Sequence, residues 1–106
     1  MKWVKIFNSL NEAKERMANK TPIKITVGNK VLCGVRINDN LHVSTNKCPH
    51  SGAALNEGRV NHLNEIICPL HSYRFNLLDG REANSQCADL EIFPVRIKED
   101  GVYLAL

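Results

Sequence analysis

The sequence predicts an all-β fold, an antiparallel sandwich or barrel with one short N-terminal helix. From Ile23 onward, apolar and polar residues alternate with a period of two, which is the spacing of a half-buried strand. The alternating segments are short, and turns rich in Asn, Asp and Gly separate them, which favours antiparallel hairpins. A chain of 106 residues is long enough for one core and too short for two. We therefore expect a single domain spanning residues 1–106.

The N-terminal segment predicts the first strand and the helix. Residues 3–7 are rich in aromatic and β-branched side chains, a composition typical of strands. Ser9 and Glu12 have the spacing of a capping box, in which the Ser side chain caps the first helical turn. Apolar residues then recur at helical spacing until Pro22 interrupts them. This pattern predicts a helix over residues 10–19.

The rest of the chain predicts short strands joined by turns. Residues 31, 33, 35 and 37 are expected to form one apolar face, and Asp79-Gly80 to form a hairpin turn. Residues 81–90 are polar and irregular. Strands are expected at residues 23–27, 31–37, 41–45, 65–67, 73–77, 91–98 and 102–106.

Composition and charge argue against two classes of protein. The 14 Lys and Arg residues exceed the 11 Asp and Glu residues by a formal charge of +3, but they are scattered, and aromatic residues make up only 6%. A nucleic-acid-binding protein would need a basic stripe with interleaved aromatics, so no nucleic-acid partner is expected. No apolar run approaches the roughly 20 residues of a membrane helix, and the N-terminus lacks the apolar region of a secretory signal. We therefore expect a cytoplasmic protein with no membrane partner.

Cysteines and histidines outside the central motif have ordinary explanations. Cys33 falls on an apolar strand face, where we expect a buried, unreactive thiol. Cys87 lies in the irregular segment and is either a plain loop residue or a reactive thiol. His42 is on the polar face of its strand and His62 lies among turn-forming residues, so both are expected to be exposed.

The chemistry of the chain is concentrated in two short motifs. Cys48-Pro49-His50 is followed, after 17 residues, by Cys68-Pro69-Leu70-His71. Thiols of a cytosolic protein stay reduced, so metal binding explains Cys48 and Cys68 better than disulfides do. Two thiolates and two imidazoles suit either a zinc ion or an iron–sulfur cluster. Zinc fingers place two cysteines before two histidines, whereas here each motif supplies one of each. This alternation favours a two-metal site in which each motif spans both metals.

The two segments 48–55 and 68–75 resemble the cluster loops of Rieske-type [2Fe–2S] proteins, in particular the stand-alone Rieske ferredoxins of bacterial oxygenase systems. Gly52 and Leu55 also match the family pattern, and the flanking strands are similar from Trp3 to Leu106. The resemblance implies a Rieske-like β-sandwich whose small cluster-binding subdomain has two loops, at about residues 46–76. It further implies one [2Fe–2S] cluster per chain. The implied ligands are Cys48 and Cys68 on one iron, and His50 and His71 on the other.

Departures from the family pattern concern the surroundings of the cluster. High-potential respiratory members carry an extra cysteine in each loop, joined as a disulfide, where this chain has Ala53 and Leu70. Tyr73 and Phe75 stand where those members have a Ser and a Tyr that hydrogen-bond the cluster. With fewer hydrogen bonds to the reduced cluster, we expect a reduction potential near the bottom of the range of about −150 to +300 mV.

The function implied by the resemblance is one-electron transfer. The sequence contains no dinucleotide-binding or flavin motif, so it is expected to be an electron carrier rather than an enzyme. The expected partners are a flavoprotein reductase as donor and a terminal oxygenase, or similar oxidoreductase, as acceptor. Two alternatives stay open: the small subunit of a nitrite reductase-like complex, and a non-catalytic interaction or sensor module stabilised by zinc or an iron–sulfur cluster.

Overall fold

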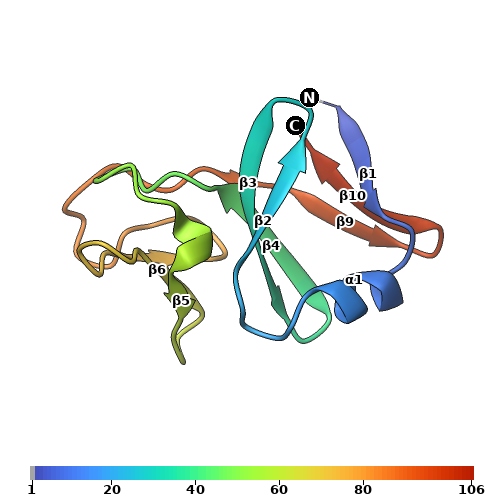
Figure 1. Cartoon of the computed structure of the whole chain (residues 1–106), viewed down its shortest axis with the longest axis horizontal. Coiled ribbons are helices and arrows are strands. Elements are labelled where there is room, and N and C mark those ends of the chain that lie inside the picture. The colour runs from blue at the N-terminus through green and yellow to red at the C-terminus, as the bar shows by residue number, and fades with distance from the viewer. Residues whose placement is uncertain (1) are drawn as a thin grey trace.

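The chain divides into a larger body and a small subdomain that projects from it (Figure 1). The computed structural model describes residues 2–106. Its elements are β1 (Trp3–Phe7), α1 (Leu10–Arg16), β2 (Ile23–Val27), β3 (Lys30–Ile37), β4 (Asn40–Thr45), a 3₁₀ turn (Leu55–Glu57), β5 (Arg59–Val60), β6 (Glu65–Ile67), β7 (Arg74–Asn76), β8 (Ile92–Phe93), β9 (Val95–Lys98) and β10 (Gly101–Ala105). The predicted fold class, all-β with one short N-terminal helix, is confirmed.

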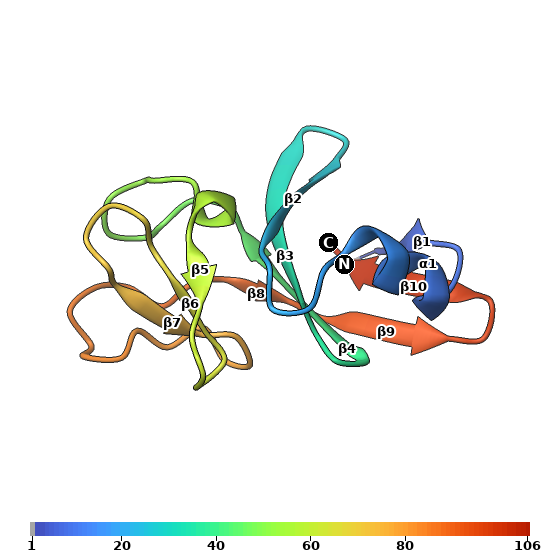
Figure 2. The same cartoon turned by 60° about the horizontal axis from the view of Figure 1, so that its bottom comes forward.

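The strands form three antiparallel sheets. Two of them build the body, in the orders β1-β10-β9 and β2-β3-β4-β8, and the third, β5-β6-β7, belongs to the small subdomain. We define the small subdomain as residues 46–91, between β4 and β8, and the body as the remaining residues. Figure 2 shows the two parts at opposite ends of the molecule, whose longest extent is 40 Å.

Strand β3 holds the two parts together because both of its faces are buried. Cys33 and Val35 are 1% and 0% exposed and pack into the core of the small subdomain. Leu32, on the opposite face, is 2% exposed and packs against Val43 in the body. The prediction of a single apolar face that includes Val31 was therefore partly wrong. Val31 lies beside the β2–β3 turn and is 48% exposed.

Helix α1 begins where the sequence predicts and ends three residues early. The backbone N–H of Glu12 donates to the Ser9 hydroxyl at 3.0 Å, which confirms the cap, but the Glu12 carboxylate accepts from the backbone N–H of Asn8 at 3.1 Å. Past Arg16 the chain leaves the helix to pair with β3. The backbone N–H of Lys20 donates to the carbonyl of Arg36 at 2.7 Å, and this contact replaces the last helical turn.

Pro94 divides the single strand that was expected over residues 91–98. Because proline has no backbone N–H, it cannot continue a hydrogen-bonded ladder. Strand β8 therefore pairs with β4, whereas β9 pairs with β10 in the other sheet. The chain thus passes from one sheet of the body to the other at Pro94, directly after leaving the small subdomain.

The irregular segment 81–90 is tied to the small subdomain by backbone contacts and one buried carboxylate. Glu82 is 5% exposed and accepts hydrogen bonds from the backbone N–H groups of Asn84 and Gln86, at 3.1 and 2.7 Å. The Leu90 N–H donates to the Gly80 carbonyl at 2.8 Å. The predicted hairpin turn at Gly80 is confirmed: the Asn76 N–H donates to the Arg81 carbonyl at 2.9 Å, and Phe75 and Glu82 form an antiparallel bridge beyond it.

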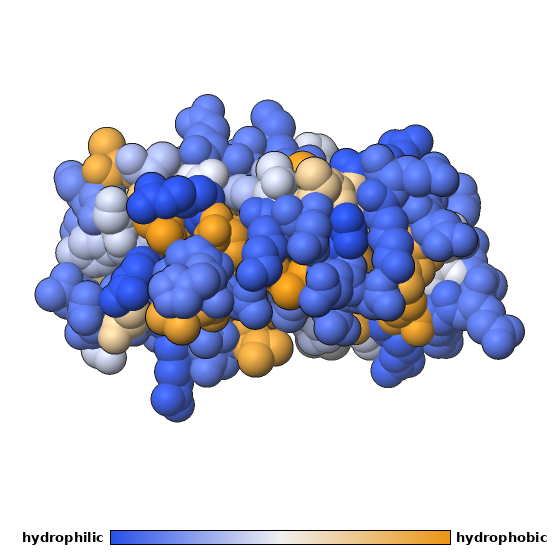
Figure 3. Space-filling model, turned by 90° about the horizontal axis from the view of Figure 1, so that it is seen from below, coloured by the Kyte–Doolittle hydropathy of each residue, from blue (hydrophilic) through white to orange (hydrophobic). Residues whose placement is uncertain are grey.

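The surface offers no extended apolar face in the view of Figure 3, where apolar residues form separate patches between polar ones. Within residues 2–106, no helix is long and apolar enough to cross a membrane.

Replacing Gly80 with alanine is expected to destabilise the fold strongly. Gly80 has a φ of +79°, and a Cβ there would lie 1.9 Å from the carbonyl oxygen of Leu90. Backbone strain of about 1–2 kcal/mol and overpacking of about 1–3 kcal/mol would both lower the free energy of unfolding. Gly28→Ala is the matched control, because Gly28 has a φ of +59° and open space around it. In urea unfolding, Gly80→Ala should lose much more free energy of unfolding than Gly28→Ala. Equal losses in the two variants would contradict this account.

Candidate metal centre

The loop that carries Cys48 and His50 is a tight turn closed by two backbone hydrogen bonds. The N–H of Cys48 donates to the carbonyl of Ala53 at 2.9 Å, and the N–H of Gly52 donates to the carbonyl of Cys48 at 2.8 Å. Gly52 has a φ of +78°, in the left-handed region that glycine adopts without strain. Gly52 therefore allows the tight turn of this loop.

The second loop repeats the same turn. The N–H of Cys68 donates to the carbonyl of Tyr73 at 2.8 Å, and the N–H of Ser72 donates to the carbonyl of Cys68 at 3.1 Å. Ser72, four residues after its cysteine like Gly52, has a φ of +59°. Both turns therefore present a cysteine at their base, and the histidine lies two residues later in the first loop and three residues later in the second.

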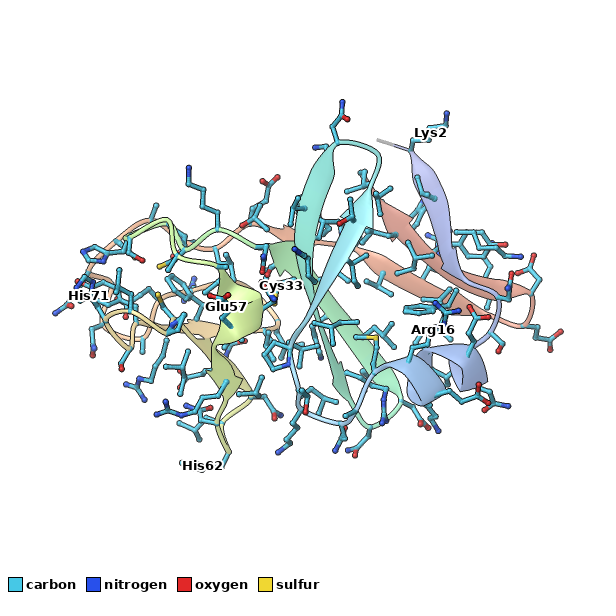
Figure 4. The ribbon with its side chains drawn as sticks, in the orientation of Figure 1. Lys2, Arg16, Cys33, Glu57, His62 and His71 are labelled. Atoms are coloured by element: carbon cyan, nitrogen blue, oxygen red, sulfur yellow. The ribbon has the colours of Figure 1, made fainter. Side chains whose placement is uncertain are left out.

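The two loops separate thiols from imidazoles. Cys48 and Cys68 are 2% and 1% exposed and belong to the core of the small subdomain, whereas His50 and His71 are exposed. The centroids of the two imidazole rings lie 5.4 Å apart, edge to face. Figure 4 shows His71 at the outer end of the subdomain. The structure thus brings together all four predicted residues as an inner pair of thiols and an outer pair of imidazoles.

Two apolar side chains close the inner side of the site. Leu55 and Phe75 are both 0% exposed and lie in the same core cluster as the two thiols. They keep water away from the buried sulfur atoms.

The surroundings of Cys68 favour its thiolate form. Burial alone would raise the pKa of this thiol. Hydrogen bonds from the Ser51 hydroxyl, from the backbone N–H groups of Leu70 and His71, and from the Cys48 thiol outweigh burial, and the pKa of Cys68 is lowered from its ordinary value. Because thiolates rather than thiols bind metals, this environment suits a metal ligand.

Sequence reasoning missed the role of Ser51. Its hydroxyl oxygen accepts a hydrogen bond from the N–H of Ala53 at 3.3 Å, which leaves the O–H free to donate. The Sγ atom of Cys68, in the other loop, lies 3.5 Å from this oxygen. A hydroxyl one residue after a candidate histidine ligand is the signal that could have identified this contact.

The position of the Tyr73 ring could not be predicted from the sequence. Its ring stacks on the imidazole of His50, with ring centroids 4.1 Å apart and planes 11° apart. The stack covers one face of His50 and restrains rotation of this otherwise exposed ring.

The remaining cysteines lie outside the four-residue site. Cys33 is 1% exposed, and burial raises its pKa to about 12, which confirms the expected buried thiol. Cys87 is half-buried, and its thiol donates to the carbonyl of Ala88 at 3.4 Å. Burial and the nearby carboxylates of Glu82 and Asp89 raise the pKa of Cys87. Its surroundings therefore favour the plain loop residue over a reactive thiol.

The two other histidines have different environments. His62 is exposed in the β5–β6 turn, as predicted (Figure 4). The expectation that His42 is exposed was wrong: it is half-buried, and this burial lowers its pKa. His42 lines a groove of about 410 Å³ that Leu63 and Leu77 of the small subdomain also line. The subdomain folds over this end of β4, an arrangement that a local alternation pattern does not contain.

Among residues 2–106, no group of three or more His, Cys, Asp or Glu side chains is placed so that it could hold a single metal ion. The inner thiol pair and the outer imidazole pair instead have the chemistry of a cluster with two irons, one of which takes two thiolates and the other two imidazoles. The donor set therefore fits a Rieske-type cluster.

Comparisons with known proteins agree with this fit. The family model described as the Rieske [2Fe–2S] domain matches residues 3–94, and the chain belongs to this family, whose cofactor is a [2Fe–2S] cluster. Ferredoxin CarAc of Metapseudomonas resinovorans is 36% identical over 80 residues, which cover 74% of each chain.

Two solved structures show how widely this fold is used. A chain in the complex of reduced oxygenase and oxidised ferredoxin in carbazole 1,9a-dioxygenase superposes with a TM-score of 0.78 at 31% identity, covering 97% of this chain and 92% of its own. The nitrite reductase small subunit from Mycobacterium tuberculosis superposes with a TM-score of 0.81 at 18% identity, covering 99% and 95%. At that identity the second likeness shows the fold alone.

Replacing Ser72 with glycine is expected to stabilise the folded protein. A non-glycine residue at a φ of +59° carries about 1 kcal/mol of backbone strain, which glycine relieves, although its greater freedom in the unfolded chain offsets part of this gain. Urea unfolding of Ser72→Gly should give a higher free energy of unfolding by up to about 1 kcal/mol. Ser72→Ala, which keeps the strain, is the control and should not be stabilised; a gain for alanine as large as that for glycine would contradict the assignment of strain.

Proposed function

We propose that this protein is a one-electron carrier that takes electrons from a flavoprotein reductase and delivers them to a terminal oxygenase. The observation that carries the proposal is the pairing of buried thiols with exposed imidazoles on two matching turns. Its relatives support the proposal, because they are ferredoxins of dioxygenase systems, and one similar chain was solved in complex with its oxygenase. On this proposal, the chain acts as a single cytoplasmic domain and a component of an oxidoreductase system, not as an enzyme in its own right.

The residues proposed to hold the cluster are the four of the candidate site. Cys48 and Cys68 would bind one iron as thiolates, and His50 and His71 would bind the other through neutral imidazole nitrogen. When bound, the cluster supplies a centre that accepts and releases one electron at a time. The buried Leu55 and Phe75 exclude water from the thiolate side.

The exposed end of the two loops is the proposed docking surface. His50 and His71 lie there beside Pro49, Pro69 and Leu70, and Leu70 is 59% exposed. A large apolar side chain next to the imidazoles can pack against a partner and shorten the distance for electron transfer. Donor and acceptor would use this end in turn.

The alternatives have less support. The likeness to a nitrite reductase small subunit concerns the fold alone, and no contact of the candidate site favours that function. Membership of the Rieske [2Fe–2S] domain family argues against a zinc-stabilised module.

The proposed ligand set predicts the behaviour of a His71→Cys variant. The purified protein should be red-brown and contain two irons and two acid-labile sulfides per chain. His71→Cys should shift or abolish the electron paramagnetic resonance (EPR) spectrum of the reduced cluster, because it removes an imidazole from one iron. His62→Cys, at an exposed turn, is the matched control and should leave the spectrum unchanged. An unaltered spectrum in His71→Cys would remove His71 from the ligand set.

The hydrogen bond from Ser51 predicts a change in reduction potential. Its hydroxyl donates toward Cys68, and such a donor stabilises the more negative, reduced cluster. Ser51→Ala should therefore lower the potential by about 20–60 mV, the equivalent of about 0.5–1.5 kcal/mol for a one-electron couple. Protein-film voltammetry measures the shift, and Ser51→Thr should retain most of the wild-type potential. A potential that stays the same or rises in Ser51→Ala would show that the hydroxyl does not act on the cluster.

A further inference from the structure

The two loops of the candidate site are joined by two crossed side-chain contacts. Ser51 of the first loop lies 3.5 Å from the Sγ atom of Cys68 in the second loop. In the opposite direction, Tyr73 of the second loop stacks on the imidazole of His50 in the first loop, with ring centroids 4.1 Å apart and planes 11° apart. Each loop therefore contributes one side chain that contacts a proposed ligand in the other loop.

Tyr73 is fixed on the second loop by its backbone and by packing. Its carbonyl accepts the hydrogen bond from the Cys68 N–H, at 2.8 Å, that closes the turn. The next residue, Arg74, begins β7 and pairs with Ile67 of β6. The half-buried side chain of Tyr73 packs against the core of the small subdomain. The ring that contacts His50 is therefore held in place by the rest of the subdomain.

The two imidazoles differ in how they are covered. Both side chains are exposed, and their rings meet edge to face with centroids 5.4 Å apart. Within residues 2–106, the stacked aromatic contact lies on His50 and not on His71. Metal-binding histidines are generally oriented by the surrounding protein, most often through a hydrogen bond to the second ring nitrogen. For His50, the stack with Tyr73 is a contact that orients the ring.

Stacking limits the rotation of the His50 side chain. An imidazole that rotates freely must give up its other rotamers when it binds a metal, and it turns away again when that bond opens. A stacked imidazole has given up much of this freedom beforehand, because turning away breaks the contact between the two rings.

We propose that Tyr73 is a positioning residue for His50: its ring holds the imidazole in one orientation and so slows the loss of iron from the site. This inference rests on the proposed function, because that function makes His50 a ligand of the cluster.

The rate of cluster loss from the holoprotein tests this role. Tyr73→Leu removes the ring and keeps an apolar side chain, whereas Tyr73→Phe keeps the ring. Each protein is incubated with excess EDTA in the absence of oxygen, and the decay of the visible absorption measures cluster release. From the strength of an aromatic pair, we expect release to be about two- to tenfold faster in Tyr73→Leu and unchanged in Tyr73→Phe. Tyr103→Leu, on β10 of the body, is the matched control and should release its cluster at the wild-type rate.

Equal release rates in the leucine and phenylalanine variants would overturn the inference, because the stacked ring would then have no effect of its own. If Tyr73→Leu holds no cluster, Tyr73→Phe decides. Release from Tyr73→Phe at the wild-type rate supports the role of the ring, whereas severalfold faster release, or no cluster at all, overturns it.

A spectroscopic measurement separates positioning of His50 from a general loosening of the subdomain. In reduced protein that carries ¹⁵N-labelled histidine, pulsed EPR records the coupling of each bound imidazole nitrogen. One of the two couplings should broaden in Tyr73→Leu, because only His50 loses its stack, and the other should keep its width. Broadening of both couplings, or of neither, would overturn the inference.

Failure of the proposed function would look different, because the wild-type protein would then contain no iron–sulfur cluster to release. A wild-type protein that holds its cluster, together with a Tyr73→Leu variant that releases it equally slowly, would overturn the role of Tyr73 alone and leave the proposed function intact.

Discussion

The structure depends on one constraint: each of two short loops must place a thiol inside the protein and an imidazole outside it. A five-residue turn closed by paired backbone hydrogen bonds meets this constraint twice, at Cys48 and at Cys68. Backbone geometry rather than side-chain packing thus defines the base of each loop. Packing then fixes the depth of the site, because the two thiols share a core with Leu55, Phe75 and the inner face of β3.

Strand β3 allows the chain to divide into two parts that stay joined. A strand that is buried on both faces can support a core on each side, and β3 does so through Cys33 and Val35 on one face and Leu32 on the other. The body anchors the subdomain, and the subdomain holds the imidazoles at the far end of the long axis.

Much of the fold and of the candidate site could be predicted from local sequence patterns, and the features that could not be predicted have physical causes. Strand β1, the helix cap at Ser9 and the gathering of the four Cys and His residues follow from short motifs and their order. The end of α1, the strand break at Pro94 and the burial of His42 depend on contacts between distant segments, which alternation patterns do not encode. The contact of Ser51 with Cys68 likewise joins two loops that lie apart in sequence. The low reduction potential predicted from Tyr73 and Phe75 stays a prediction. That prediction did not include the hydroxyl of Ser51, which lies beside Cys68.

The central claim is that two histidines bind one iron of a two-iron cluster while two cysteines bind the other. The most direct test is pulsed EPR of the reduced protein grown with ¹⁵N-labelled histidine, which detects nitrogen nuclei bound to the cluster. The account predicts strong couplings from two histidine nitrogens, with one of them lost in His50→Cys. Coupling from only one histidine, or from none, would contradict it.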